Sequence, residues 1–360
     1  MSRFHPIPVA SVRHDTREAI VVTLAVPEAL RDQYRYVQGQ HVTLRAQIDG
    51  EEMRRTYSIC SAVQDETLRV AIKCVPAGVF SPWAHATLAP GYVVDVLPPS
   101  GRFNVPLSAE QRRHYVAFAA GSGITPVFGI IKTTLRAEPQ SRVTLVYGNR
   151  SSSHVILREE LADLKDSYRD RLNLVFVMSR EPQEIDLFNG RIDRAKCDAL
   201  LDKWIDPRTI DVAFVCGPGT MIEDVTASLE AHGVRKEHIK SERFIANQTR
   251  RAYRSVPASS VISAPGLCEV TIVQDGRRRQ FTMARNSTSI LDAGLAQGLE
   301  LPYACKGGIC STCRCKVAEG EVDMNASVAL EDYELARGFR LLCQSYPLSE
   351  RLVLDYDQET

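Results

Sequence analysis

The sequence predicts a multidomain protein: an antiparallel β-barrel, then an α/β domain with a doubly wound parallel sheet, then a small α+β domain. Residues 1–108 alternate apolar and polar positions in short runs, whereas residues 109–248 alternate apolar strands with helical patterns. Residues 266–360 contain four cysteines within eleven positions, CKGGICSTCRC. A chain of 360 residues suits two or three domains of roughly 100–200 residues each.

The first domain is predicted to be all-β, because its short alternating runs are separated by proline and glycine. A further strand is expected to begin at Arg55, and a helix is expected to begin at Pro82 with Ser81 as its N-cap. The predicted strands are AIVVTLAV, QHVTLRAQ, TLRVAIKCV and YVVDVL.

The second domain is predicted to be a parallel sheet, because its apolar strands are followed by helical patterns. Helices are expected from Pro126, around LREELADLKDSY and around MIEDVTASLEAHG, and ligands of such sheets bind beyond the carboxyl ends of the strands. The predicted strands are YVAFAA, VTLVYG, LNLVFVMSR and DVAFVCG.

Residues 249–265 are rich in Ser, Ala and Pro and are predicted to be an interdomain linker. The third domain should begin with a hairpin that turns at Asp275-Gly276. A short helix is then expected after the N-cap Ser289, with Gly298 just past its end.

The composition excludes several classes of protein. The net charge of zero implies no strong attraction to nucleic acids or membranes, and no apolar run reaches the roughly 18 residues of a transmembrane helix. The first twenty residues lack the apolar run of a signal peptide, so we expect a cytoplasmic protein. Thiols stay reduced there, which argues against disulfides among the ten cysteines.

The cysteine spacing predicts an iron–sulfur cluster. Cys305, Cys310 and Cys313 follow the pattern C-x4-C-x2-C, and Cys343 comes after 29 intervening residues, in a segment expected to be a strand. A zinc site is the main alternative, but zinc usually takes two close ligand pairs and only one C-x2-C is present. Cys315 is a fifth local cysteine and is predicted to be a non-ligand on the strand after the loop.

Two segments are suited to binding phosphates. Arg55 in the barrel and the helix start after Gly78 together suit a pyrophosphate, although an exposed barrel strand with Arg, Tyr and Ser can also be ordinary surface. AAGSGITP follows a strand and opens a helix, with Gly121 and Gly123 allowing close approach and Thr125 as a possible cap. The G-x-G-x-x-G fingerprint is not met, because position 126 is Pro.

Arginines after the next two strands indicate a nucleotide with a 2′-phosphate. Arg150 follows VTLVYGN, and Ser179-Arg180 ends LNLVFVMSR, with no Asp or Glu at these positions. The sequence therefore favours NADPH over NADH.

The motif RTYS, followed by GVFS and later by GSGITP, resembles the ferredoxin–NADP reductase family over residues 5–247, and CKGGICSTC resembles plant-type ferredoxins, which have a β-grasp fold. The resemblance implies FAD binding: Arg55 on the phosphates, Tyr57 against the isoalloxazine and Ser58 near flavin N5. The residues that it assigns to the flavin are Arg55, Thr56, Tyr57, Ser58, Gly78, Val79, Phe80 and Ser81.

For the nicotinamide nucleotide, the resemblance implies binding by Gly121, Gly123 and Thr125, a 2′-phosphate grip by Ser179 and Arg180, and Cys216-Gly217 beside the nicotinamide. Glu242 and Phe244 match the acidic–aromatic end of the reductase module, although here the chain continues beyond them. Ser58, Cys216 and Glu242 are the implied catalytic residues, and the metal ligands are Cys305, Cys310, Cys313 and Cys343.

A reductase joined to a carboxyl-terminal ferredoxin resembles the reductase components of multicomponent oxygenases, in particular those that serve di-iron epoxidases in aerobic phenylacetate degradation. The resemblance implies electron transfer from NADPH through FAD and [2Fe–2S] to a di-iron oxygenase component. The chain has no set of E-x-x-H pairs that would make it the oxygenase itself. The alternatives are a phthalate-type reductase that uses FMN and NADH, an iron–sulfur redox sensor, and a stand-alone reductase of small acceptors.

Overall fold

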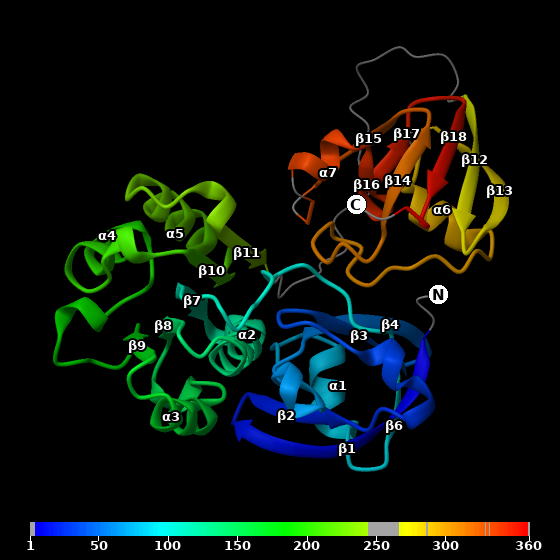
Figure 1. Cartoon of the computed structure of the whole chain (residues 1–360). Helices are drawn as coiled ribbons and strands as arrows, with labels where there is room; N and C mark the ends of the chain where they lie inside the picture. The colour runs from blue at the N-terminus through cyan, green and yellow to red at the C-terminus, as the bar shows by residue number, and fades with distance from the viewer. Residues whose placement is uncertain (1–3, 244–265, 286, 328, 331, 359–360) are drawn as a thin grey trace. The chain divides into compact units, whose positions relative to one another are not determined.

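A computed structural model describes residues 4–243, 266–285, 287–327, 329–330 and 332–358 (Figure 1). The chain divides into two compact units, a larger one of Phe4–Ala246 and a smaller one of Met1–Arg3 with Asn247–Thr360. The predicted linker 249–265 and Phe244 lie outside the described residues.

The larger unit begins with a six-stranded antiparallel sheet of order β4-β3-β6-β1-β2-β5. A bridge between Ile59, just after β4, and Val70 on β5 joins the two ends of this order, which closes the predicted barrel. Helix α1 packs against β4 and β5, as Figure 1 shows beside the blue strands. These elements are β1 (His5–Thr16), β2 (Ala19–Leu24), β3 (His41–Ile48), β4 (Glu51–Ser58), β5 (Leu68–Lys73), α1 (Phe80–Thr87) and β6 (Val93–Val96).

The second half of the larger unit is a five-stranded, fully parallel sheet of order β11-β10-β7-β8-β9. One core lies under α2 and α3, and a second core lies under α4 and α5, so helices cover both faces as predicted. The sequence did not predict α4 or β11. The elements are β7 (His114–Ala120), α2 (Ile124–Ala137), β8 (Arg142–Asn149), α3 (Arg158–Ser167), β9 (Leu172–Met178), α4 (Arg194–Lys203), β10 (Val212–Gly217), α5 (Gly219–Ala231) and β11 (Ile239–Arg243).

The barrel and the parallel sheet share a core. Ala19, Val21, Cys60 and Ala71 of the barrel pack in the same apolar cluster as α2 and β7. Gly129 on α2 allows this close contact, because a β-carbon added there would lie 2.8 Å from the carbonyl oxygen of Ile59. The two halves of the larger unit are therefore packed together rather than joined by a loop alone.

The smaller unit contains a five-stranded mixed sheet of order β13-β12-β18-β14-β16 and a separate pair, β15-β17. The predicted hairpin turn is confirmed, with Asp275 and Gly276 at φ values of 54° and 70°. The Ser289 side chain accepts a hydrogen bond from the Asp292 amide, which confirms the predicted N-cap. The elements are β12 (Leu267–Gln274), β13 (Arg277–Ala284), α6 (Ile290–Ala296), β14 (Arg314–Glu319), β15 (Val322–Met324), α7 (Asp332–Ala336), β16 (Phe339–Leu341), β17 (Ser345–Pro347) and β18 (Arg351–Asp355).

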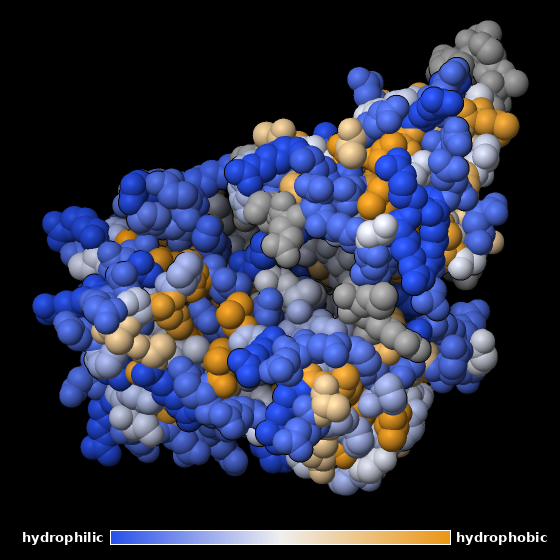
Figure 2. All heavy atoms as spheres, turned by 45° about the vertical axis from the view of Figure 1, so that its right-hand side comes forward, coloured by the Kyte–Doolittle hydropathy of each residue, from blue (hydrophilic) through white to orange (hydrophobic). Residues whose placement is uncertain are grey.

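The surface is mostly hydrophilic on the face drawn in Figure 2, with apolar side chains in small groups. Among the described helices, none combines the length and the apolar character needed to span a membrane.

Candidate functional site

The flavin motif lies at the end of β4. We expected Arg55 to begin a strand, but β4 starts at Glu51 and ends at Ser58, because Glu51 to Arg54 already pair with β3. Thr56 is opposite Thr43, with 3.3 Å between their hydroxyl oxygens, and Ser58 is opposite His41. The motif, Arg55 to Ser58, is therefore the last part of β4.

Tyr57 packs beside the start of α1. Its ring centroid lies 6.0 Å from that of Phe80, and burial raises the pKa of its hydroxyl well above the usual value. Phe80 itself is 1 % exposed and belongs to the barrel core. The Phe80 side chain therefore fixes the turn Gly78–Ser81 to the barrel core.

The turn before α1 differs from the prediction in the start of the helix and in the role of Ser81. The helix begins at Phe80 rather than Pro82, and the Ser81 hydroxyl accepts a hydrogen bond from the Val75 amide at 2.9 Å instead of capping the helix. Gly78 donates its amide to the Val75 carbonyl oxygen at 2.9 Å. Val79 precedes the helix and provides no side-chain cap, so amides of the first turn remain suited to an anion.

The nucleotide loop is pressed against the end of β10. Gly121 has a φ of 54°, and a β-carbon at Gly123 would lie 2.1 Å from the carbonyl oxygen of Cys216. Helix α2 starts at Ile124, and the Thr125 hydroxyl donates to the Ser122 carbonyl oxygen at 3.0 Å, so Thr125 lies inside the helix and is not its N-cap. Glycine is therefore favoured at position 121 by its backbone angle and required at position 123 by the close contact with β10, and a loop with two glycines suits the close approach of a pyrophosphate.

Ser58, Glu242 and Cys216 meet between the barrel and the parallel sheet. The Ser58 hydroxyl donates to Glu242 Oε2 at 3.3 Å, although 184 residues separate them. Glu242 is paired with Cys216 in the β10–β11 register, and His41 Nδ1 lies 3.9 Å from Glu242 Oε1. Gly217 follows Cys216, and a β-carbon there would lie 2.7 Å from Met221 Cε.

Burial changes the acidity of two of these groups. It raises the pKa of Glu242 to about 7, with the Ser58 hydrogen bond opposing the shift. It also raises the pKa of the Cys216 thiol well above its usual value, and the nearby Glu242 charge adds to this. Cys216 is therefore a neutral thiol at neutral pH, whereas Glu242 can take up or release a proton there.

We expect Glu242 to make the larger unit less stable as pH rises. Its folded-state pKa is about 7 against an ordinary 4.5, so the folded state holds a proton that the unfolded state lacks, and stability falls between pH 4.5 and 7. The whole shift corresponds to about 3 kcal/mol, and we expect about 2 kcal/mol because 17 % of the side chain is exposed.

Glu242→Gln should remove this dependence, so that its stability relative to the natural chain rises by about 2 kcal/mol from pH 5 to pH 8. Urea unfolding followed by tryptophan fluorescence measures this, because both tryptophans, Trp83 and Trp204, lie in the larger unit. An equal difference between the two chains at both pH values would contradict the assignment.

The predicted 2′-phosphate residues lie together at the carboxyl ends of β8 and β9. The Arg180 amide donates to the Arg150 carbonyl oxygen at 2.8 Å, and the Ser179 amide donates to that of Asn149 at 2.9 Å. Sequence reasoning missed Glu181, whose carboxylate accepts from the Ser152 amide at 2.7 Å. The Glu181 carboxylate therefore holds the loop that follows Arg150.

Sequence reasoning also missed that Lys73 and His154 lie, together with Arg150, around the carboxylate of Glu18. Glu18 lies 3.4 Å from Lys73, 3.9 Å from Arg150 and 3.7 Å from His154. Lys73 ends β5, and its ammonium group lies 3.9 Å from a β-carbon built at Gly121. The barrel thus brings a cation to the nucleotide loop, and no local motif could have indicated it.

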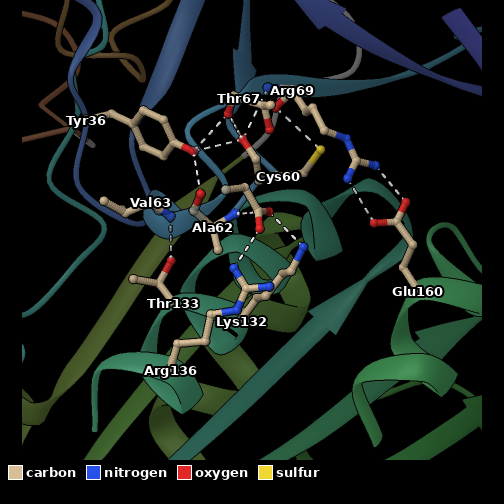
Figure 3. Close-up of polar contacts among 12 residues, drawn as sticks. Tyr36, Cys60, Ala62, Val63, Thr67, Arg69, Lys132, Thr133, Arg136 and Glu160 are labelled. Atoms are coloured by element: carbon tan, nitrogen blue, oxygen red, sulfur yellow. Dashed lines mark hydrogen bonds and ion pairs between the residues drawn. The ribbon is translucent and has the colours of Figure 1, made fainter. Parts of the chain in front are cut away.

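Ion pairs tie α2 and α3 to the barrel (Figure 3). Asp65 accepts from Lys132 at 2.7 Å and from Arg136 at 2.6 Å, both on α2. Arg69 on β5 donates to Glu160 on α3 through two hydrogen bonds of 3.0 and 2.6 Å. Since α2 carries the nucleotide loop at its start, these pairs fix that loop relative to β4 and β5.

The four predicted metal ligands come together in the smaller unit. All four thiols are buried, and Cys305 interacts with the thiols of Cys310 and Cys343. Cys343 also interacts with Cys313. The Cys310 thiol lowers the pKa of Cys305, and Cys305 in turn raises the pKa values of Cys310 and Cys343. Within the described residues, no three His, Cys, Asp or Glu side chains form a site tight enough for one metal ion.

The loop around these thiols depends on left-handed residues. Lys306 and Ser311 both have φ of 51°, and Gly308 has φ of 76°. The Gly307 amide donates to Cys305 Sγ at 3.3 Å. Such amide–sulfur contacts suit thiolate ligands of an iron–sulfur cluster.

The structure corrects the predicted local structure at Cys343 and confirms it at Cys315. Cys343 was expected in a strand, but it lies in a short 3-10 turn, Leu342–Gln344, between β16 and β17, where the Leu342 amide donates to the Cys313 carbonyl oxygen at 3.1 Å. Cys315 is on β14, as predicted, and is 1 % exposed.

Three stretches match known domain families: residues 7–105 an oxidoreductase FAD-binding domain, residues 118–227 an oxidoreductase NAD-binding domain, and residues 272–348 a 2Fe-2S iron-sulfur cluster binding domain. Together with the glycine-lined loops and the four gathered thiols, these matches define an oxidoreductase that uses FAD, a nicotinamide nucleotide and a [2Fe–2S] cluster in one chain.

Relatives with similar sequences show which kind of oxidoreductase this chain is. The chain is 45 % identical to one of the subunits of the 1,2-phenylacetyl-CoA epoxidase of Escherichia coli over 99 % of both chains. It is 31 % identical to the ferredoxin reductase component of 3-ketosteroid-9-alpha-monooxygenase of Rhodococcus rhodochrous, over 99 % of this chain and 97 % of that one. The chain therefore belongs to the family of oxygenase reductase components that combine FAD-binding, NAD-binding and 2Fe-2S domains.

A solved structure has a similar fold. Phthalate dioxygenase reductase matches 98 % of both chains with a TM-score of 0.56 and 21 % identity, which supports the fold. This reductase family acts with an oxygenase partner, as the names of both relatives indicate.

Proposed function

We propose that the chain is the reductase component of a phenylacetyl-CoA epoxidase complex and passes electrons from NADPH to a di-iron oxygenase component. The observation that carries this proposal is the 45 % identity to the Escherichia coli epoxidase component across 99 % of both chains, compared with 31 % for the ketosteroid reductase. We also propose that residues 1–108 bind FAD, residues 109–248 bind NADPH, residues 249–265 link the domains and residues 266–360 bind the cluster. The free thiols of all ten cysteines fit a cytoplasmic location.

The cofactors would supply the redox chemistry: FAD accepts a hydride as two electrons and releases electrons singly, which the one-electron [2Fe–2S] cluster requires. In this proposal Arg55, Thr56 and the turn Gly78–Ser81 hold the flavin phosphates, and Tyr57 packs against the ring system. Gly121, Gly123 and Thr125 hold the pyrophosphate of NADPH.

The residues between the barrel and the sheet would position the reaction. Ser58 offers a hydroxyl where the flavin ring would lie, and it is hydrogen-bonded to Glu242, which holds or releases a proton near neutral pH. Cys216 and Gly217 are the last two residues of β10, where the nicotinamide ring would lie in this proposal. The uncharged Cys216 thiol suits contact with the nicotinamide ring, because it brings no competing negative charge.

The preference for NADPH would come from Arg150, Ser179 and Arg180. Arg180→Ala should raise the KM for NADPH by roughly 10- to 100-fold and that for NADH less than twofold, because a charge-assisted contact to the 2′-phosphate is worth about 1.5–3 kcal/mol. Steady-state reduction of a dye with each nucleotide measures both values. Arg169→Ala removes an exposed arginine elsewhere on the domain and should change neither KM. Equal effects on the two nucleotides would exclude a 2′-phosphate contact.

Reconstitution tests the proposed function. The purified chain should contain one FAD and two irons, and it should support NADPH-dependent epoxidation when mixed with the oxygenase component of a phenylacetyl-CoA epoxidase. A ketosteroid monooxygenase oxygenase is the matched control, since its own reductase is 31 % identical to this chain. Turnover with the control and none with the epoxidase would contradict the assignment and favour another oxygenase. Nucleotide binding without any electron transfer would favour a redox sensor.

A further inference from the structure

Tyr356 follows the last strand, β18, and has a buried hydroxyl group without a hydrogen-bond partner among the described residues. Other buried tyrosines in the chain use this group: Tyr34 donates to the Val96 carbonyl oxygen at 2.7 Å, and Tyr147 donates to that of Gly121 at 2.9 Å. A buried hydroxyl that loses its hydrogen bonds to water costs roughly 1–3 kcal/mol. The unpaired group in Tyr356 therefore indicates an acceptor that the described part of the chain does not provide.

The strand register places Tyr356 beside the cysteine loop. On β14 and β18, Lys316 pairs with Asp355 and Val317 pairs with Leu354 in antiparallel register. One step further along this register, Cys315 comes opposite Tyr356. The Tyr356 amide is fixed by a hydrogen bond of 2.9 Å to the Val273 carbonyl oxygen, so the backbone position is held from the other side.

The side chain packs toward the cluster thiols. Tyr356 lies against the same core as Cys313, Cys315 and Cys343. Burial raises the pKa of its phenol well above the usual value, and the nearby thiols of Cys315, Cys313 and Cys343 add to this. The buried hydroxyl therefore belongs to a side chain that packs against an apolar core containing these three cysteines.

We propose that the Tyr356 hydroxyl donates a hydrogen bond to a sulfur atom of the [2Fe–2S] cluster and thereby raises the reduction potential of that cluster. The proposal rests on the cluster being held by Cys305, Cys310, Cys313 and Cys343. Reduction adds negative charge to the cluster sulfurs, so a donor aimed at them stabilises the reduced form more than the oxidised form. Tyr356 is a positioning residue in this account, since it acts through the cluster rather than on a substrate.

Tyr356→Phe in the full chain tests the proposal, because it removes only the hydroxyl. In a redox titration monitored by electron paramagnetic resonance, the ratio of reduced to oxidised cluster at a fixed potential should fall about fivefold, as loss of a hydrogen bond worth about 1 kcal/mol predicts. Tyr333→Phe is the matched control, since Tyr333 is 49 % exposed, and it should leave the ratio unchanged. A loaded Tyr356→Phe cluster whose ratio changes less than twofold would overturn the proposal.

A second measurement covers the case in which Tyr356→Phe fails to assemble its cluster. Replacing all tyrosines of the otherwise natural chain by 3-fluorotyrosine makes each hydroxyl a stronger donor and should raise the reduced-to-oxidised ratio. An unchanged ratio would overturn the proposal without any substitution. Absence of iron from the natural chain would instead contradict the ligand set, so the two failures can be told apart.

Discussion

Cys313→Ala should abolish electron transfer beyond the flavin while NADPH still reduces the flavin at the normal rate. The reason is that the four proposed cluster ligands belong to the smaller unit, whereas the residues proposed for the flavin and the nucleotide belong to the larger unit. In the proposed ligand set, loss of one of the four thiolates leaves an iron without its ligand, so the cluster should not assemble. Stopped-flow absorbance gives the flavin step, and NADPH-dependent turnover of the oxygenase component gives the complete path.

Cys315→Ala is the matched control for this experiment. Cys315 is buried like Cys313 and lies two residues away, but we predict that it is not a ligand. The variant should retain two irons per chain and electron transfer to the oxygenase. Loss of iron from Cys315→Ala together with retention in Cys313→Ala would mean that the ligand set has been assigned wrongly.

Gly123→Ala should reduce kcat/KM for NADPH by at least about 100-fold, since a displacement near 1 Å can cost that much. The added methyl group would lie 2.1 Å from the Cys216 carbonyl oxygen and 2.6 Å from its carbonyl carbon, so the loop or the end of β10 must move. Both carry residues proposed to contact the nucleotide. Anaerobic flavin reduction at increasing NADPH concentrations measures the effect.

Gly219→Ala distinguishes this effect from a general intolerance of alanine near β10. Gly219 begins α5 two residues after Gly217, and its added methyl group would make an ordinary contact of 3.5 Å with Arg243 Nη1. Its kcat/KM should stay within about twofold of the natural value, since most substitutions that meet no clash have small effects. An equal loss in both variants would show that the position of the methyl group does not matter, which would contradict the argument.

The order of the domains followed from sequence because each has its own periodicity and turn chemistry. The hairpin at Asp275-Gly276 and the cap at Ser289 were predicted correctly, since both depend on neighbouring residues alone. Helix starts were less accurate: Ser81 and Thr125 are good caps by propensity, but each hydroxyl is hydrogen-bonded to a different backbone group. Such competition between local hydrogen bonds cannot be read from a single motif.

The parts of the site that depend on distant pairing were not predicted. The hydrogen bond between Ser58 and Glu242 needs β11 beside β10 and the whole sheet against the barrel. Strand β11 itself was missed, because its five residues, Ile239–Arg243, show little of the apolar character of a parallel strand. Lys73 was missed because only tertiary packing brings it to the nucleotide loop. The contact of Glu181 with the Ser152 amide was missed because it depends on β8 lying beside β9.

The ion pairs of Asp65 and Glu160 have a further consequence for how this reductase could be reused. Helices α2 and α3 are held to the barrel by ion pairs and a common core. The flavin-binding half and the nucleotide-binding half should therefore be exchangeable between proteins only together. A chimera in which only one half is exchanged would need new partners for Asp65 and Glu160 and a new shared core. Exchange of the smaller unit would leave every one of these contacts in place, because they all lie within the larger unit, so the one-electron module can be replaced independently of the hydride-accepting module.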